Sequence, residues 1–224
     1  MLAGPGARAQ RSAEPAPPDL SGIWTRVDTI GGGSYEGIGE TFQPAQLLPS
    51  AAARVAARMA QPGPPPLRRC AVGGAGGGID VNSSAIAMVQ GGDEIVLVRD
   101  GSSGGRHIHM DGHTLPLNWV PTNNGHSVGR WERGALVVET TGLTPGMVGF
   151  GRGWREPSTL LTETFRLSAD RQTLTITYVW DDPAIYVRPH RYAISFERSQ
   201  NPDYILENWC DASTQGNKNP DDYR

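Results

Sequence analysis

The chain has 224 residues, with 20 Lys and Arg against 23 Asp and Glu and a formal net charge of −3. This near-neutral balance lacks the electrostatic attraction that supplies most non-specific nucleic-acid binding, so we expect no nucleic-acid partner. The 29 glycines, 18 prolines and charged fraction of 19% exclude a protein dominated by long helices.

The N-terminal residues resemble the end of an export signal. Residues 7–9, Ala-Arg-Ala, form a small-x-small pattern like a signal-peptidase site. We expect residues 1–18 to be a signal-peptide remnant and disordered leader, although a plain disordered N-terminus is the alternative. The first reading predicts a periplasmic or secreted protein. Gly, Pro or a charge interrupts every apolar run before the roughly 20 residues of a membrane span, so we expect no membrane partner.

The two cysteines are consistent with an oxidising compartment. Cys70 and Cys210 form an even count, which favours one disulfide closing a very long loop. Such a bridge would stabilise the fold by about 2–4 kcal/mol. Two buried thiols are the alternative.

Helical periodicity is clear only once, near residue 50. Ser50 can cap a helix that runs to Met59, with Ala52, Val55 and Ala56 on its apolar face together with Met59. The Gly- and Pro-rich residues 62–78 then predict a long loop. They contain neither GxGxxG nor GK[ST], so a phosphate-binding loop has no support.

After residue 86 the chain becomes a series of short runs rich in β-branched and aromatic residues, separated by turn signals. These predicted strands are residues 95–98, 106–110, 127–131, 135–140, 160–167, 174–180, 191–197 and 204–209. Little helix separates them, which favours an antiparallel barrel or sandwich. We predict a mainly β protein, a single-domain antiparallel β-barrel over residues 19–211 with one short helix and long Gly/Pro-rich loops. A polar tail over residues 212–224 follows it.

Side-chain alternation assigns the faces of the later strands. In residues 160–167, Glu163 shares its face with the apolar positions, which places a carboxylate among core residues. In residues 174–180 and 191–197 the bulky faces include Tyr178 and Tyr192. We expect these tyrosines, together with Trp119, to line a ligand pocket.

Histidines concentrate in residues 106–113 (RHIHMDGH), and His126 follows across a connection rich in Asn. Alternation puts His107, His109 and Asp111 on one face. If that face lines an enclosed space, these groups are suited to general acid/base catalysis near neutral pH. The alternative is that Ile108 and Met110 face the core and the imidazoles face solvent.

Two other chemistries remain as alternatives. His107, His109 and His126 are residue types that could bind Zn or another divalent metal, although their spacing is not diagnostic. Residues 125–129 (GHSVG) match GxSxG, with Asp182 and His190 in hydrolase order. However, PTNN precedes Ser127 and a hairpin follows it, where a nucleophile elbow needs a strand and then a helix.

Four segments together resemble an uncharacterised family of exported bacterial proteins. They are residues 19–24 (DLSGIW), 106–112 (RHIHMDG), 125–132 (GHSVGRWE) and the dipeptide Asp182-Pro183. The sequence departs from the family pattern at Arg133-Gly134-Ala135, where GDT is usual, and at His113 and Thr164, where the family has Arg. Separately, Gly22-x-Trp24 is similar to the first strand of lipocalin-like (calycin) barrels, which enclose an apolar ligand pocket.

These observations favour an exported barrel that binds an apolar or aromatic small molecule and acts on it without a cofactor, as a lyase, isomerase or hydratase. In this hypothesis the catalytic group is His107, His109, Asp111 and His126, with Glu163 as a second acid. A non-catalytic carrier or sensor is one alternative, and a metal-dependent enzyme built on the histidine triplet is another.

Overall fold

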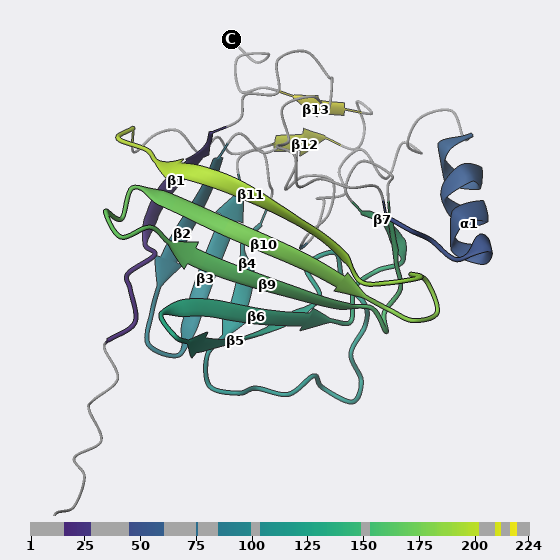
Figure 1. Ribbon diagram of the computed structural model, residues 1–224, viewed down its shortest axis with the longest axis horizontal. Helices are drawn as coiled ribbons and strands as arrows, with labels where there is room; N and C mark the ends of the chain where they lie inside the picture. The colour runs from purple at the N-terminus through teal and green to yellow at the C-terminus, as the bar shows by residue number, and fades with distance from the viewer. Residues whose placement is uncertain are drawn as a thin grey trace, which may run out of the picture.

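The computed structural model describes residues 16–27, 45–60, 75, 85–99, 104–148, 153–201, 209–211 and 216–218. Within them the chain forms a closed β-barrel with one short helix beside it (Figure 1). The barrel strands are β1 (Gly22–Arg26), β2 (Ala85–Gln90), β3 (Glu94–Arg99), β4 (Arg106–His109), β5 (His126–Glu132), β6 (Ala135–Thr141), β9 (Leu160–Leu167), β10 (Thr173–Asp181) and β11 (His190–Arg198). The prediction of a mainly β, single-domain barrel is confirmed.

Outside the barrel wall lie the helix and two small hairpins. These are α1 (Pro49–Met59), the pair β7 (Gly146–Val148) and β8 (Gly153–Arg155), and the pair β12 (Trp209–Asp211) and β13 (Gly216–Lys218). Within the described part of the chain, no helix is long and apolar enough to cross a membrane.

Strand order around the barrel is β1-β11-β10-β9-β6-β5-β4-β3-β2, and β1 pairs with β2 to close it. Each neighbouring pair is antiparallel except β4 and β5, which run parallel. Parallel neighbours cannot be joined by a tight turn. Residues 110–125 therefore return from the end of β4 to the start of β5, and we call them the crossover segment.

The hairpin expected at residues 131–135 joins β5 to β6. Arg133 and Gly134 both have positive φ, of 49° and 74°. Two successive residues of this kind form the primed turn that matches the right-handed twist of antiparallel strands. The turn depends only on neighbouring residues, and the structure confirms the hairpin that the sequence predicts after Ser127.

The helix differs from its prediction in two respects. It begins at Pro49, whose fixed φ suits a first helical turn, and its N-cap, Leu48, makes no side-chain capping bond. The expected Ser50 cap is therefore wrong. Only Ala51 is buried, and Met59 is 64% exposed, so the predicted apolar face is not the packed one.

The barrel interior has an apolar end and a polar end. The apolar end holds large buried side chains from β1, β2, β9, β10 and β11, among them Trp24, Met88, Phe165, Leu174 and Phe196. The strand β2, which sequence patterning did not predict, contributes to this end. Toward the start of β4 and the end of β10, buried polar side chains lie among apolar ones such as Leu161 and Trp180.

Candidate functional site

A layer of four buried polar side chains crosses the barrel interior. Arg106, Ser127, Thr140 and Glu163 come from β4, β5, β6 and β9, and we call them the inner polar layer. Arg106 and Glu163 are each only 1% exposed. Each strand delivers one of them because alternate residues point inward, so Arg106 shares a face with Ile108, and Glu163 lies between Leu161 and Phe165.

An ion pair organises the inner polar layer. Arg106 Nη1 donates to Glu163 Oε1 at 2.9 Å, and Arg106 Nη2 donates to Glu163 Oε2. Nη2 also donates to Thr140 Oγ1 at 2.7 Å, and Nε donates to Ser127 Oγ at 3.0 Å. A two-pronged guanidinium–carboxylate pair is a strong and directional contact. Arg106 therefore fixes the position of the Glu163 carboxylate across the barrel.

A row of rings continues from this layer along β10 and β11. Tyr178 lies opposite Glu163 in the β9–β10 register and stacks on Tyr192 with ring centroids 4.9 Å apart. The His190 ring is 5.4 Å from Tyr192 and 6.2 Å from Tyr186. We call Tyr178, Tyr192, His190 and Tyr186 the aromatic row. The structure thus places the predicted ligand residues Tyr178 and Tyr192 inside the barrel.

Two hydrogen bonds fix the hydroxyls of the aromatic row. Trp180 Nε1 donates to Tyr192 Oη at 3.3 Å, and Tyr186 Oη donates to the Trp154 carbonyl at 2.5 Å. Burial is the main cause that raises the pKa of Tyr186 above its ordinary 10.0. Tyr186 therefore stays a neutral hydrogen-bond donor throughout the range in which a histidine titrates.

The ionisable face of β4 points away from this interior. Arg106 and Ile108 are buried, whereas the His107 side chain is 58% exposed and forms an ion pair with Glu94 through Nδ1 and Oε1, 2.7 Å apart. The alternative in which Ile108 faces the core is the one observed. The physical reason is that a charge can be buried when it is paired, and Glu163 provides that partner for Arg106.

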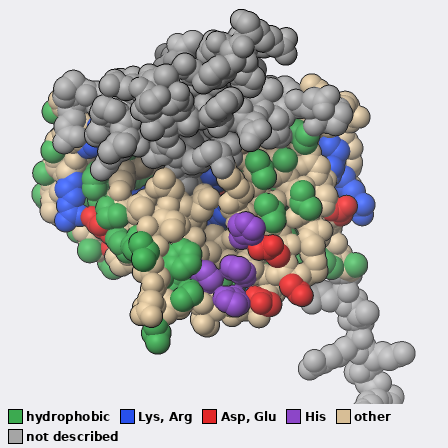
Figure 2. Space-filling view, turned by 180° about the vertical axis from the view of Figure 1, so that it is seen from behind, with side chains coloured by type: hydrophobic (Ala, Val, Ile, Leu, Met, Phe, Trp, Pro, Cys, Tyr) green, Lys and Arg blue, Asp and Glu red, His purple; other side chains and the backbone are tan. Residues whose placement is uncertain are grey.

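Three histidines instead gather on the outer face of β4 and β5. The His109 ring stacks on His113 at 5.0 Å and on His126 at 5.1 Å, and His113 and His126 are 6.2 Å apart. We call these three the outer histidine stack. Figure 2 shows the histidines grouped on this face of the molecule with acidic side chains beside them.

The crossover segment lies over this face. His126 Nε2 and the His113 carbonyl are 3.2 Å apart. His126 is buried although its side chain points away from the barrel interior, because the crossover segment covers it. Trp119 packs its edge against His126 with ring centroids 5.5 Å apart and donates from Nε1 to the Gly142 carbonyl at 2.9 Å. Trp119, expected in the pocket, belongs to this outer segment, as does exposed Asp111.

The predicted catalytic group is therefore divided by the barrel wall. Glu163, Tyr178 and Tyr192 lie inside, while His107, His109, Asp111, His126 and Trp119 lie outside. The two sets do not form one site. Among the described residues, no group of three or more His, Cys, Asp or Glu side chains is arranged to hold a metal ion, and this covers the triplet His107, His109 and His126.

Several expectations fall on the margins of the described chain. Cys70 lies outside the described residues, and for Cys210 only the backbone of β12 is described, so the disulfide stays a prediction. Most of the leader, most of the loop at residues 62–78 and most of the tail also lie outside the described residues, so the predictions for them stay predictions.

Sequence reasoning missed the partner of Glu163. Alternation in residues 106–109 also groups Arg106 with Ile108, so the signal was present: one cation and one anion, each on an otherwise apolar face.

Ser127 has a structural role, not the position of a hydrolase nucleophile. Its GxSxG match lies within β5, and its Oγ contacts Arg106 and, at 3.0 Å, Thr140 Oγ1, with no helix following it.

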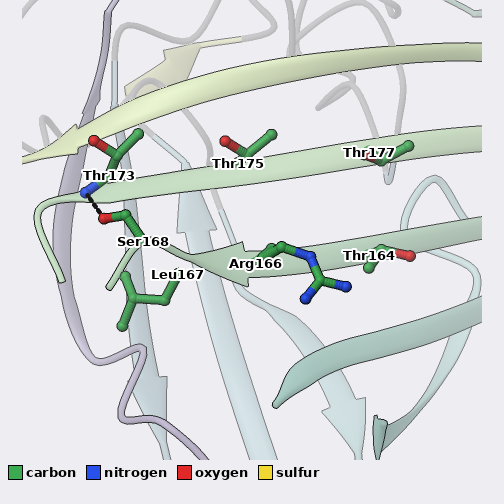
Figure 3. A pocket seen from close by; sticks show the side chains of 7 residues that line it. All are labelled: Thr164, Arg166, Leu167, Ser168, Thr173, Thr175 and Thr177. Carbon is green, nitrogen blue, oxygen red and sulfur yellow. Dashed lines mark hydrogen bonds between the residues drawn. The ribbon is translucent and has the colours of Figure 1, made fainter. Parts of the chain in front are cut away.

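An open groove of about 270 Å³ lies on the outer face of β9 and β10 (Figure 3). It is lined by Thr164, Arg166, Leu167, Ser168, Thr173, Thr175 and Thr177. Figure 3 shows threonine side chains along both strands, with Ser168 accepting from the Thr173 amide at 2.9 Å. The groove contains none of the predicted site residues, and short surface hydroxyls give it little means of selecting a ligand.

No protein-family model matches the chain, and no curated protein matches its sequence.

Proposed function

We propose that the protein is a small-molecule-binding barrel whose ligand lies at the polar end of the interior, between the inner polar layer and the aromatic row. The observation that carries this proposal is the buried Arg106–Glu163 pair. A well-packed apolar interior is often as stable as a buried ion pair or more so, because charges lose their hydration. Buried charges that lower the free energy of unfolding in this way are expected mainly at functional sites.

The neighbours of the pair suggest the class of ligand. Stacked tyrosines and Trp180 offer flat apolar faces, while the hydroxyls and the guanidinium–carboxylate pair offer directional hydrogen bonds. Sites for small organic molecules combine these two features, a mostly apolar lining with a few placed polar groups. An apolar or aromatic molecule with one or two polar substituents fits them best.

We further propose acid/base chemistry on this ligand, of the lyase, isomerase or hydratase type. The group that favours it is His190, which is buried inside the barrel and whose ring neighbours those of Tyr192 and Tyr186. A buried imidazole can accept a proton from a bound molecule and return it without a cofactor. A carrier that only binds is the alternative, and turnover is what separates the two.

Ligand binding is tested with 1-anilinonaphthalene-8-sulfonate, an aromatic probe whose fluorescence rises in apolar sites. We expect Tyr192→Ala to weaken probe binding about tenfold or more, since the variant removes a central ring of the row. His107→Ala, on the outer face of the wall, is the matched control and should bind like the wild type. Equal affinity in all three proteins would show that the probe does not enter the interior.

Native mass spectrometry of the purified chain then identifies any retained ligand, which supplies the substrate for turnover assays of His190→Gln.

Export and family membership are also proposals. They are supported by the small-x-small pattern at residues 7–9 and by the motifs at residues 19–24, 106–112 and 125–132. The corresponding measurements are N-terminal sequencing of the mature chain and a thiol titration without reductant. A cytoplasmic chain with two reactive thiols would contradict both export and the Cys70–Cys210 bridge.

A further inference from the structure

The crossover segment is held to the barrel at few points in its first half. Residues 111–118 are all exposed, and Leu117 is fully so. This half meets the wall through the stacking of His113 on His109, through the bond between His126 Nε2 and the His113 carbonyl, and through Leu115, whose Cδ1 lies over Gly142. Trp119 is the next anchor along the chain, through Gly142. The second half is fixed more firmly, by backbone bonds between Thr122 and both Gly142 and Thr144.

We propose that the outer histidine stack is an acid-sensitive clamp, which holds residues 111–120 on the barrel when its rings are neutral and releases them when the rings are protonated.

The three rings of the outer histidine stack lie close together. Three imidazoles lie within 5.0–6.2 Å of one another, with His109 in the middle. Histidine is the side chain whose charge ordinarily changes between about pH 5 and pH 8. Like charges at this separation repel appreciably even near a protein surface. Successive protonation therefore turns a stacking contact into a repulsive one.

The surrounding charges do not cancel this repulsion. On β3, Glu94 is already engaged by His107, and on the crossover segment Asp111 lies beside His113, with Oδ2 and Nδ1 3.5 Å apart. On β5 and β6, Arg130 and Glu139 pair with one another at 2.9 Å, and Arg130 also binds Glu132. Among the described residues, no hydrogen bond or ion pair reaches the His109 ring. Two carboxylates, Asp111 and the Glu94 that lies opposite His109 in the β3–β4 register and is shared with His107, thus face up to three positive rings.

Asp111 itself does not produce a transition in the same range. The backbone amide of His113 donates to its carboxylate at 3.0 Å and lowers the pKa of Asp111 below its ordinary 3.8. Asp111 is therefore ionised from pH 7.5 to pH 5 in both the held and the released segment. Its charge is the same at both pH values, so Asp111 cannot cause a loss of order between them.

The experiment follows the mobility of the Trp119 indole N–H and of the amides of residues 114–120 by the heteronuclear NOE in the full chain. Mobility is preferred to chemical shift because a nearby charge changes the shift without any movement. We expect rigid values at pH 7.5 and flexible ones at pH 5, while the barrel amides stay rigid. Rigid values for the segment at pH 5 in the folded wild type would overturn the proposal.

Three variants sharpen the result. His109→Phe keeps a ring in the middle of the stack but cannot be charged, so the segment should stay rigid to a lower pH than in the wild type. Glu132→Gln is the control, on the outer face of β5 but outside the stack, and should keep the wild-type transition. His113→Ala should be mobile at both pH values. A transition unchanged in His109→Phe would also refute the clamp.

Discussion

The two faces of the wall formed by β4 and β5 treat ionisable groups in opposite ways. On the inside, Arg106 and Glu163 are held by hydrogen bonds in one arrangement and have almost no contact with water. On the outside, His107 and His109 lie close to other titratable groups and contact water, and only the crossover segment covers His126. The comparison teaches that a cluster of histidines in sequence does not identify the interior of a barrel. Burial selects charges that have a partner, whichever residues are chemically more versatile.

The largest expected effect comes from breaking the inner pair. Glu163→Ala leaves the Arg106 guanidinium buried and uncompensated, and should lower the free energy of unfolding by about 3–5 kcal/mol. Urea unfolding monitored by circular dichroism measures it. Glu139→Ala is the control, because it removes an exposed pair with Arg130 and should cost less than about 1 kcal/mol. Equal losses would mean that the inner pair is no more important than a surface contact.

A smaller effect is expected within the aromatic row. Tyr192→Phe removes the acceptor of the Trp180 indole N–H, which is fully buried, and should cost about 1–3 kcal/mol. The same unfolding measurement applies. Thr175→Ala, which removes a half-buried hydroxyl that bonds Ser195 on the outer face of the same strand pair, should cost less. The reverse order would contradict the inner location of the hydrogen bond.

A change at Gly142 examines the outer face. Its φ is +65°, and an added Cβ would lie 2.5 Å from Trp119 Nε1. Gly142→Ala should therefore cost about 1–3 kcal/mol and displace Trp119 from its carbonyl partner. Gly134 has a similar φ of +74°, and an added Cβ there would have no atom within 4 Å. Gly134→Ala therefore measures the free-energy cost of the backbone conformation without a steric clash. If both variants unfold alike and keep a rigid Trp119 indole, the packing of Trp119 against Gly142 is unimportant.

The smallest effect is expected at Asp111, whose side chain is about half exposed. Because its pKa is lowered in the folded chain, its contribution to stability is present above pH 3.8 and is lost as the pH falls through the lowered native value. Asp111→Asn should thus differ slightly from the wild type near neutral pH and converge with it in acid. Thermal unfolding at pH 6 and pH 3 makes the comparison. A difference that grows on acidification would have the wrong sign.

Periodicity in the sequence was sufficient for the barrel and for its long central strands. Alternation in residues 160–167 and 174–180 placed Glu163 and Tyr178 correctly, because two faces of a strand in a closed barrel have very different surroundings. The short run at residues 106–109 was harder. Both of its faces carry ionisable groups, so the choice between them depended on Glu163, 57 residues away in sequence. Alternation within one strand contains no information about such a partner, and the same limitation hid the parallel pairing of β4 with β5.

The parallel pairing of β4 with β5 follows from the odd number of strands in the barrel. Directions can alternate all the way round a closed ring of strands only when their number is even, and this ring has nine: β1, β2, β3, β4, β5, β6, β9, β10 and β11. Two adjacent members must then point the same way. Here they are β4 and β5, which follow one another in the chain, so a long return must join them. The residues of that return can change, but the return itself must remain for as long as β4 and β5 are parallel neighbours.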